Sequence, residues 1–276
     1  TGRRRVGPDG LEAHSRIGKD PAHPERSPTG PGSRGSLRRI LPLPAESLDP
    51  ELLGLFASIG IKKGQLFEPD ERMKQILTEA AAVGNATVRS IYFRGRDKAA
   101  YQYDNRYWKT GFVGGSHEFL SNGTRLLDAR AMFYYIATFT TPAMILKIPG
   151  AGAQYSGATV DAKGNPLDGS KNYRLYLPPD VPAKDFWSVV VYDNQTRSLL
   201  QTDQPYPSLM SQRGVQANSD GSYDIYFGPE APAGKESNWI QTIPGKGWNV
   251  IIRFYGPLES WFDQTWRPDD IELENN

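Results

Sequence analysis

The sequence predicts an α+β fold: a disordered N-terminal tail, a small helical region, and then an antiparallel β-sandwich or jelly-roll domain. Three observations lead to this prediction. Residues 1–44 are rich in Arg, Gly, Pro and Ser and have almost no apolar periodicity. Apolar residues then recur at helical spacing, and after Pro149 they occur in short segments separated by Pro and Gly turns. We therefore place the tail at residues 1–45, the helical region at 46–148 and the β-domain at 149–276.

The predicted tail is basic, with nine Arg or Lys residues against four acidic residues in 1–44. Such a segment buries too little apolar surface to offset the entropy lost on ordering, so we expect disorder. A basic nucleic-acid-binding arm is the alternative. However, no aromatic residue interleaves these charges for stacking on bases, and we expect no nucleic acid partner. The abrupt change in composition near Pro44 also fits a truncated or out-of-frame remnant.

Three helices are predicted in the helical region. Asp49 is a good N-cap and Pro50 suits the first helical position, so a short helix follows over Glu51–Ser58. A second helix begins after Pro69, because the apolar residues that follow recur at i, i+3, i+4 and i+7. Thr124–Phe139 is mostly apolar and predicts a third, buried helix.

The β-domain is predicted from short segments of strand character. Tyr173–Leu177 alternates between its two faces, whereas Phe186–Tyr192 is an almost unbroken apolar run and is expected to be central and covered on both faces. We expect these two segments to pair, and Asp220-Gly221 to form the turn of a hairpin. No helix of crossover length follows Pro149, which favours antiparallel sheets. The predicted strands are Gln154–Thr159, Tyr173–Leu177, Phe186–Tyr192, Tyr223–Phe227 and Asn249–Tyr255.

Five of the six tryptophans fall in the predicted β-domain. Buried aromatic side chains dominate core energetics, so we expect most of them to fill the interior. Trp261 and Trp266 are candidates for docking the C-terminus onto the helical region or onto another subunit.

Composition excludes several chemistries. There is no Cys, so disulfides, thiolate metal sites and Cys nucleophiles are unavailable. Only His117 lies outside the predicted tail, so we expect no metal site, and no motif indicates a cofactor. The net charge of +1 argues against a nucleic-acid-binding protein, and no apolar stretch is long enough to span a bilayer. The N-terminus as written has no apolar segment of a secretory signal.

The main candidate site lies where the predicted strand Phe186–Tyr192 ends. Loops at the strand ends of a sandwich are where polar groups collect beside a rigid scaffold. Here the residues after the strand offer carboxylates, amides and a guanidinium within a short stretch. The candidate set is Tyr192, Asp193, Asn194, Arg197, Asp203 and Gln204, with Trp239 or Trp248 as a stacking platform.

Three interpretations of this set stay open. In a hydrolase, Asp193 and Asp203 would be paired carboxylates, about 5–5.5 Å apart for retaining or about 6.5–9.5 Å for inverting glycoside chemistry. In a binding site, a tryptophan would stack on the ligand beside Arg197 and the acids. In a structural role, Asp193 and Asn194 form an Asx turn. Arg197 would then pair with Asp203 at the surface, an interaction worth about 0–1 kcal/mol.

Several runs of residues carry a family resemblance. They are Phe186–Ser198, Asn238–Thr242, Pro244–Trp248 and Tyr255–Pro257. These runs resemble the domain of unknown function families 1254 and 1214, and Leu48–Asn85 resembles the helical middle region of the same proteins, so the resemblance covers about residues 47–273. It implies a jelly-roll C-terminal domain of the 1214 type in a bacterial protein that is usually exported. The signal peptide and the N-terminal 1254-type domain of such proteins are not recognisable here.

The leading functional hypothesis is an uncharacterised bacterial envelope-type protein without catalytic activity. It would bind a small molecule or a saccharide, or assemble with copies of itself. This hypothesis rests on the lack of nucleophile and metal motifs beside an aromatic-rich β-domain. The alternative is a hydrolase that uses Asp193 and Asp203, and we expect no cofactor in either case.

Overall fold

A computed structural model describes residues 49–274, and the predicted tail lies outside these described residues. The chain divides into two compact units, the first ending at Ile76 and the second beginning at Leu77. The domain boundary that we predict near residue 148 stays a prediction. None of the described helices combines the length and the apolar character that crossing a bilayer needs.

The described part of the first unit holds α1 (Pro50–Ser58) and the start of α2 (Glu71–Arg94). Asp49 caps α1, because its side chain accepts a hydrogen bond from the Glu51 N–H at 2.9 Å. This confirms the predicted first helix and its N-cap. The second predicted helix is also present and continues to Arg94.

The second unit continues through α2 into short elements and one further helix. β1 (Leu120–Ser121) and β2 (Thr124–Arg125) form a small hairpin around the Asn-Gly turn. This hairpin takes the first residues of the predicted third helix, so α3 spans only Leu127–Ile136. The segment between α2 and β1 holds 3-10 helices at Lys98–Ala100 and Val113–Gly115, and another at Pro142–Ile145 follows α3. A small core under these elements comprises Tyr92, Ala100, Val113, Phe119, Ala129, Met132 and Phe133.

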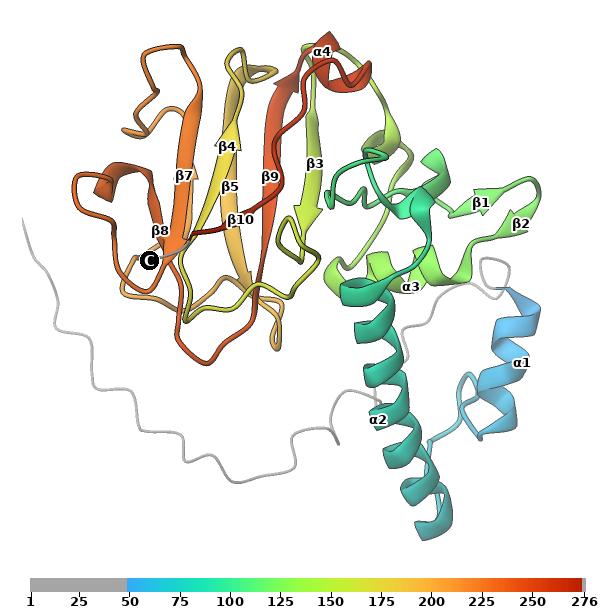
Figure 1. Ribbon diagram of the computed structural model, residues 1–276. Helices are drawn as coiled ribbons and strands as arrows, with labels where there is room; N and C mark the ends of the chain where they lie inside the picture. The colour runs from blue at the N-terminus through green and yellow to red at the C-terminus, as the bar shows by residue number, and fades with distance from the viewer. Residues whose placement is uncertain (1–48, 275–276) are drawn as a thin grey trace, which may run out of the picture. The chain divides into compact units, whose positions relative to one another are not determined.

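The β-domain consists of two four-stranded sheets, in the orders β10-β4-β7-β8 and β3-β9-β5-β6 (Figure 1). All strand pairs in these sheets are antiparallel except β7 with β8, which is parallel. The short helix α4 (Glu259–Phe262) follows β9. The strands are β3 (Ala153–Ala158), β4 (Tyr173–Leu177), β5 (Ala183–Asp193), β6 (Ser208–Met210), β7 (Tyr223–Gly228), β8 (Trp239–Gln241), β9 (Trp248–Pro257) and β10 (Glu272–Leu273).

The two sheets share one hydrophobic core. Leu175 and Phe227 enter it from the first sheet, and Val189, Val250 and Phe254 enter it from the second. Burying alternate residues of both sheets between them is what makes each sheet stable. The α+β class with antiparallel sheets is thus confirmed, while a jelly-roll connection of the strands stays a prediction.

Two predictions about strand pairing are wrong. β4 and β5 do not pair, because β4 belongs to the first sheet and β5 to the second. Asp220-Gly221 does form a turn, in which the Ser222 N–H donates to Asp220 Oδ1 at 3.0 Å, but it does not join two paired strands. The strand before it, β6, pairs with β5, and the strand after it, β7, pairs with β4 and β8.

The interior contains most of the tryptophans, as predicted. β5 is an inner strand of its sheet, and every residue from Trp187 to Val191 is buried, so it is covered on both faces. Trp187, Trp248, Trp261 and Trp266 are all buried, whereas Trp239 is half-buried.

Candidate functional site

The turn after β5 is built around the Asp193 carboxylate, which is buried. Its Oδ1 accepts hydrogen bonds from the Gln195 N–H at 2.6 Å and the Thr196 N–H at 3.3 Å, which is the predicted Asx turn. Its Oδ2 accepts from Lys246 Nζ at 2.7 Å. Burial alone would raise the pKa of this carboxyl, but the hydrogen bonds from Lys246 and the two backbone N–H groups outweigh burial and lower the pKa. Asp193 is therefore an ionised, fully engaged carboxylate at neutral pH.

Asn194 connects the turn after β5 to the start of β9 and to α2 by hydrogen bonds. Its backbone N–H donates to the Gly247 carbonyl at 3.1 Å, and its Nδ2 donates to the Trp248 carbonyl at 3.1 Å. Its own carbonyl accepts from Arg89 Nη1 at 2.8 Å. Both the side chain and the backbone of Asn194 thus serve the packing of the turn.

The predicted ion pair between Arg197 and Asp203 is not formed. Arg197 instead places its guanidinium over the ring of Tyr135, 4.5 Å from the ring centroid. Asp203 accepts at Oδ2 from Gln241 Nε2 at 3.1 Å, and its N–H donates to Gln241 Oε1 at 2.9 Å. The structural interpretation is therefore right about the Asx turn and wrong about the ion pair. Arg197 contacts Tyr135 instead, and Asp203 hydrogen-bonds with Gln241.

Gln204 acts as an extension of the sheet edge. Its Nε2 donates to the Trp239 carbonyl at 3.2 Å, and its Oε1 accepts from the Gln241 N–H at 2.9 Å. The side-chain amide thereby pairs with the backbone of β8 as a neighbouring strand would. Asp203 and Gln204 belong to this network, while Asp193 belongs to the network of Lys246, so the structure does not bring the two carboxylates into one hydrogen-bonded group.

Neither tryptophan offers an open stacking platform. Trp248 has no exposed surface, because it starts β9 with its side chain directed into the core. Its ring stacks on Phe227 with the centroids 4.9 Å apart. Trp239 is half-buried and donates its Nε1–H to the Gly228 carbonyl at 3.0 Å.

Tyr192 lies on the opposite side of its sheet from Asp193, because successive side chains of a strand alternate between faces. The outer face of the β3-β9-β5-β6 sheet carries Arg253 at its centre, directly opposite Tyr155 in β3 and Ser188 in β5. The Arg253 guanidinium carbon lies 5.7 Å from the ring centroid of Tyr155 and 5.7 Å from that of Tyr192. Arg253 also donates from Nη2 to the Tyr192 hydroxyl.

A stacked aromatic pair extends the same face. Phe186 and Tyr255 are cross-strand partners whose ring centroids lie 4.1 Å apart. Tyr155 is 46% exposed, so the face is open to solvent at its β3 side. We call these residues the outer-face cluster, which consists of Tyr155, Phe186, Tyr192, Arg253 and Tyr255.

The outer-face cluster has no negative charge to balance its arginine. Among the described residues, Arg253 forms no ion pair. The outer face of the other sheet offers a direct contrast, because Arg174 in β4 lies 3.4 Å from Asp224 and 3.3 Å from Glu272. Burial and the neighbouring Tyr255 raise the pKa of Tyr155, while Arg253 opposes this, so the hydroxyl remains a neutral hydrogen-bonding group at physiological pH. The cluster is therefore cationic and aromatic.

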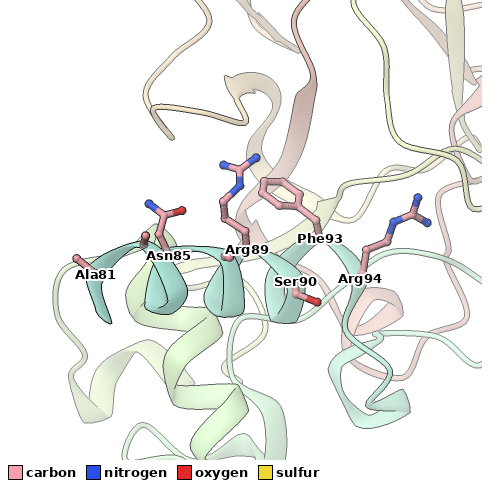
Figure 2. Close-up of a pocket in the computed structure, with 8 residues that line it drawn as sticks. Ala81, Asn85, Arg89, Ser90, Phe93 and Arg94 are labelled. Carbon is pink, nitrogen blue, oxygen red and sulfur yellow. The ribbon is translucent and has the colours of Figure 1, made fainter. Parts of the chain in front are cut away.

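A shallow groove runs along one face of α2, lined by residues from Ala81 to Arg94. Figure 2 shows Arg89 and Phe93 projecting from the same side of the helix, and the Arg89 guanidinium lies 5.2 Å from the Phe93 ring centroid. Arg89 donates to the Asn194 carbonyl, and Arg94 donates to the Gly164 carbonyl at 3.2 Å. These arginines hold α2 against loops of the β-domain.

No arrangement for a metal is present in the described part of the chain. Within residues 49–274, no three His, Asp or Glu side chains gather in a way that would hold a metal ion. Sequence reasoning found Tyr192 but missed Arg253 and Tyr155. The available signal was a lone arginine in the otherwise apolar run of the strand predicted at Asn249–Tyr255.

Fold and site together define a two-sheet β-domain that carries a cationic aromatic outer face. Residues 152–259 match the model of a family described as "Protein of unknown function (DUF1214)". The match confirms the 1214 part of the resemblance. The 1254 part stays a prediction.

Two solved structures resemble the chain. The VPA0106 protein from Vibrio parahaemolyticus is 21% identical with a TM-score of 0.42, and the alignment covers 82% of this chain and 51% of that one. An uncharacterised protein from Burkholderia cenocepacia is 15% identical with a TM-score of 0.35, and the alignment covers 81% of this chain and 47% of that one. The chain therefore spans about half the length of either protein. The search of curated proteins gave no match.

Proposed function

We propose that this chain is an exported bacterial envelope protein without catalytic activity, and that its β-domain binds an acidic saccharide on the outer-face cluster. The observation that supports the ligand class is the position of Arg253, which lies between two tyrosine rings and has no ion-pair partner among the described residues. Export belongs to the proposal because the family resemblance implies it.

The chemistry of the cluster matches an acidic sugar in two ways. A guanidinium presents donors in a planar fork that fits a carboxylate, and such charge-assisted hydrogen bonds are roughly twice as strong as neutral ones. Aromatic rings such as Tyr155 and Tyr255 offer apolar faces against which the C–H side of a sugar ring packs. A neutral sugar would use only the second of these features.

The hydrolase alternative has less support. A general acid needs a proton at neutral pH, and the pKa of Asp193 is lowered by Lys246 and the turn, so it is not suited to donate one. Asp203 hydrogen-bonds with Gln241 in a different network. A general base or nucleophile would also need free oxygens, and both oxygens of Asp193 are occupied.

Calorimetric titration with galacturonate oligosaccharides, and with neutral glucose oligosaccharides of equal length, tests the ligand class. We expect the acidic series to bind, and Arg253→Gln to weaken binding at least tenfold, because hydrogen bonds to charged groups are worth about 1.5–3 kcal/mol. Arg174→Gln is the matched control, since it removes an arginine from the outer face of the other sheet, where carboxylates already neutralise it. Equal binding of the two series, or an equal loss in both variants, would contradict the proposal.

The same samples test the alternative. We expect no release of reducing ends from any of the sugars. A hydrolytic activity that disappears when Asp193 and Asp203 are both replaced by Asn would establish the hydrolase interpretation instead.

Self-assembly is a second candidate function, and exposed apolar side chains support it. Phe139, Leu146 and Ile148 are each more than half exposed. Leu146 is beside the edge strand β3, since its carbonyl accepts from Gln154 Nε2 at 3.2 Å. Contiguous exposed apolar surface is typical of interfaces. If the chain assembles through this segment, sedimentation velocity will show a concentration-dependent dimer that Leu146→Glu abolishes, whereas a monomer at every concentration excludes it.

A further inference from the structure

A second, smaller cavity lies in the helical part of the second unit, away from the outer-face cluster. Its volume is about 270 Å³, which is close to the lower limit of about 300 Å³ for pockets that hold small molecules. It lies between the end of α2, the two 3-10 helices that follow and the start of α3. The proposed saccharide site does not include any of its lining residues.

The inner wall of this cavity is apolar and consists of packed core residues. Ala100, Val113, Ala129 and Met132 line it, and all four are buried members of the small core. They come from three different elements, so the shape of the wall is set by packing rather than by one mobile loop. An apolar wall of this kind suits the side chain of a small apolar ligand.

The rim of the cavity carries charges of both signs. Two of them already have partners, because Arg94 donates to the Gly164 carbonyl and Asp97 accepts from the Ala99 N–H at 2.9 Å. The other two, Arg96 and Asp128, are exposed, and their side chains make no hydrogen bond or ion pair with any residue that the structure describes. One cation and one anion are thus available to a ligand at the mouth of an apolar cavity.

We propose that this cavity binds a small zwitterion with an apolar side chain, of the α-amino-acid class. Arg96 takes the carboxylate, for which its planar fork of donors is suited, and Asp128 takes the ammonium group. The side chain enters the apolar wall formed by Val113, Ala129 and Met132. A simple acid or a simple amine would use only one of the two free charges, so the zwitterion is preferred over either.

Calorimetry on the full chain with L-leucine, L-methionine and L-valine tests this proposal. Two probes that keep the side chain but lose one charge, 4-methylpentanoate and 3-methylbutylamine, serve as matched ligands. We expect an amino acid to bind at least tenfold more tightly than both matched ligands. We also expect Arg96→Gln and Asp128→Asn each to weaken binding at least tenfold, while Arg213→Gln and Asp180→Asn, which alter exposed charges in the β-domain, leave it unchanged.

Thermal unfolding of each variant verifies that it folds, and these surface charges are not part of the core. Absence of amino-acid binding by the intact chain would overturn the proposal. Equal binding of the amino acid and the deaminated acid would also overturn it, as would unchanged affinity in both Arg96→Gln and Asp128→Asn. Because the saccharide site shares no residue with this cavity, failure of one proposal does not affect the other.

Discussion

Replacing Trp248 with Ala is expected to lower the free energy of unfolding by about 3–5 kcal/mol, the range for truncating a fully buried Trp or Phe. Trp248 has no exposed surface, and its ring connects the two sheets. It stacks on Phe227 of β7 at 4.9 Å and meets the edge of Tyr173 of β4 at 5.6 Å, both in the opposite sheet. The substitution would leave a cavity between the sheets, where neighbours can relax only partly.

Urea unfolding followed by far-ultraviolet circular dichroism measures this effect. Trp239→Ala is the control, because Trp239 is only half-buried and sits on the short strand β8. Its loss is expected to be clearly smaller. If Trp248→Ala changed the unfolding free energy by less than about 1 kcal/mol, Trp248 would not be a central part of the core.

Stability is expected to rise with pH between about 7.5 and 9, and Lys109 is the reason. The residue is 6% exposed, and its Nζ donates to the Tyr92 carbonyl at 2.6 Å and to Thr159 Oγ1 at 3.2 Å. The rings of Tyr92 and Tyr101 lie within 6 Å of the ammonium group, and none of the ion pairs in the described chain involves it. Burial, assisted by the nearby Arg94, lowers the pKa of Lys109 to about 8 from its ordinary value of 10.5.

The sign follows from proton counts. Between pH 8 and 10.5 the unfolded chain holds a proton on Lys109 that the folded chain has released, so the free energy of unfolding increases with pH. The increase from pH 7.5 to 9 is about 1 kcal/mol. Towards pH 10 the trend reverses, because burial raises the pKa of Tyr92 and Tyr103 and only the unfolded chain ionises them there.

Urea unfolding at a series of pH values measures this dependence, with Lys109→Met as the comparison. The variant keeps an aliphatic chain of similar length but has no proton to release, so its stability is expected to stay flat over the same interval. A wild-type curve that is flat or falls between pH 7.5 and 9 would contradict the account. A rise that persists in Lys109→Met would show that other groups cause it.

The positions of the strands in the sequence were predicted better than the pairing between strands. Alternation alone placed Tyr173–Leu177 at the bounds of β4, because side-chain period is a local property of the chain. Which strands pair depends on contacts distant in sequence, and so β4 and β5 were wrongly joined. The three-residue strand β8 was missed, since its parallel pairing with β7 is set by tertiary packing rather than by a long apolar pattern.

The candidate site was predicted less well, for a related reason. Asp193 and Asp203 were predicted as a pair because they are close in sequence. In the structure they belong to different hydrogen-bond networks. The outer-face cluster gathers Tyr155, Tyr192 and Arg253 from three strands. Only the register of β3, β9 and β5 brings these residues together, and register is not readable from a single strand.

The central claim is that an acidic ligand contacts the outer-face cluster rather than the turn after β5. Nuclear magnetic resonance of isotope-labelled protein during titration with a galacturonate trisaccharide tests it most directly. The account predicts that the Arg253 Nε–H signal and the ring signals of Tyr155 and Tyr192 move with ligand concentration. Shifts confined to residues 193–204, or no shift at Arg253 at saturating ligand, would contradict it.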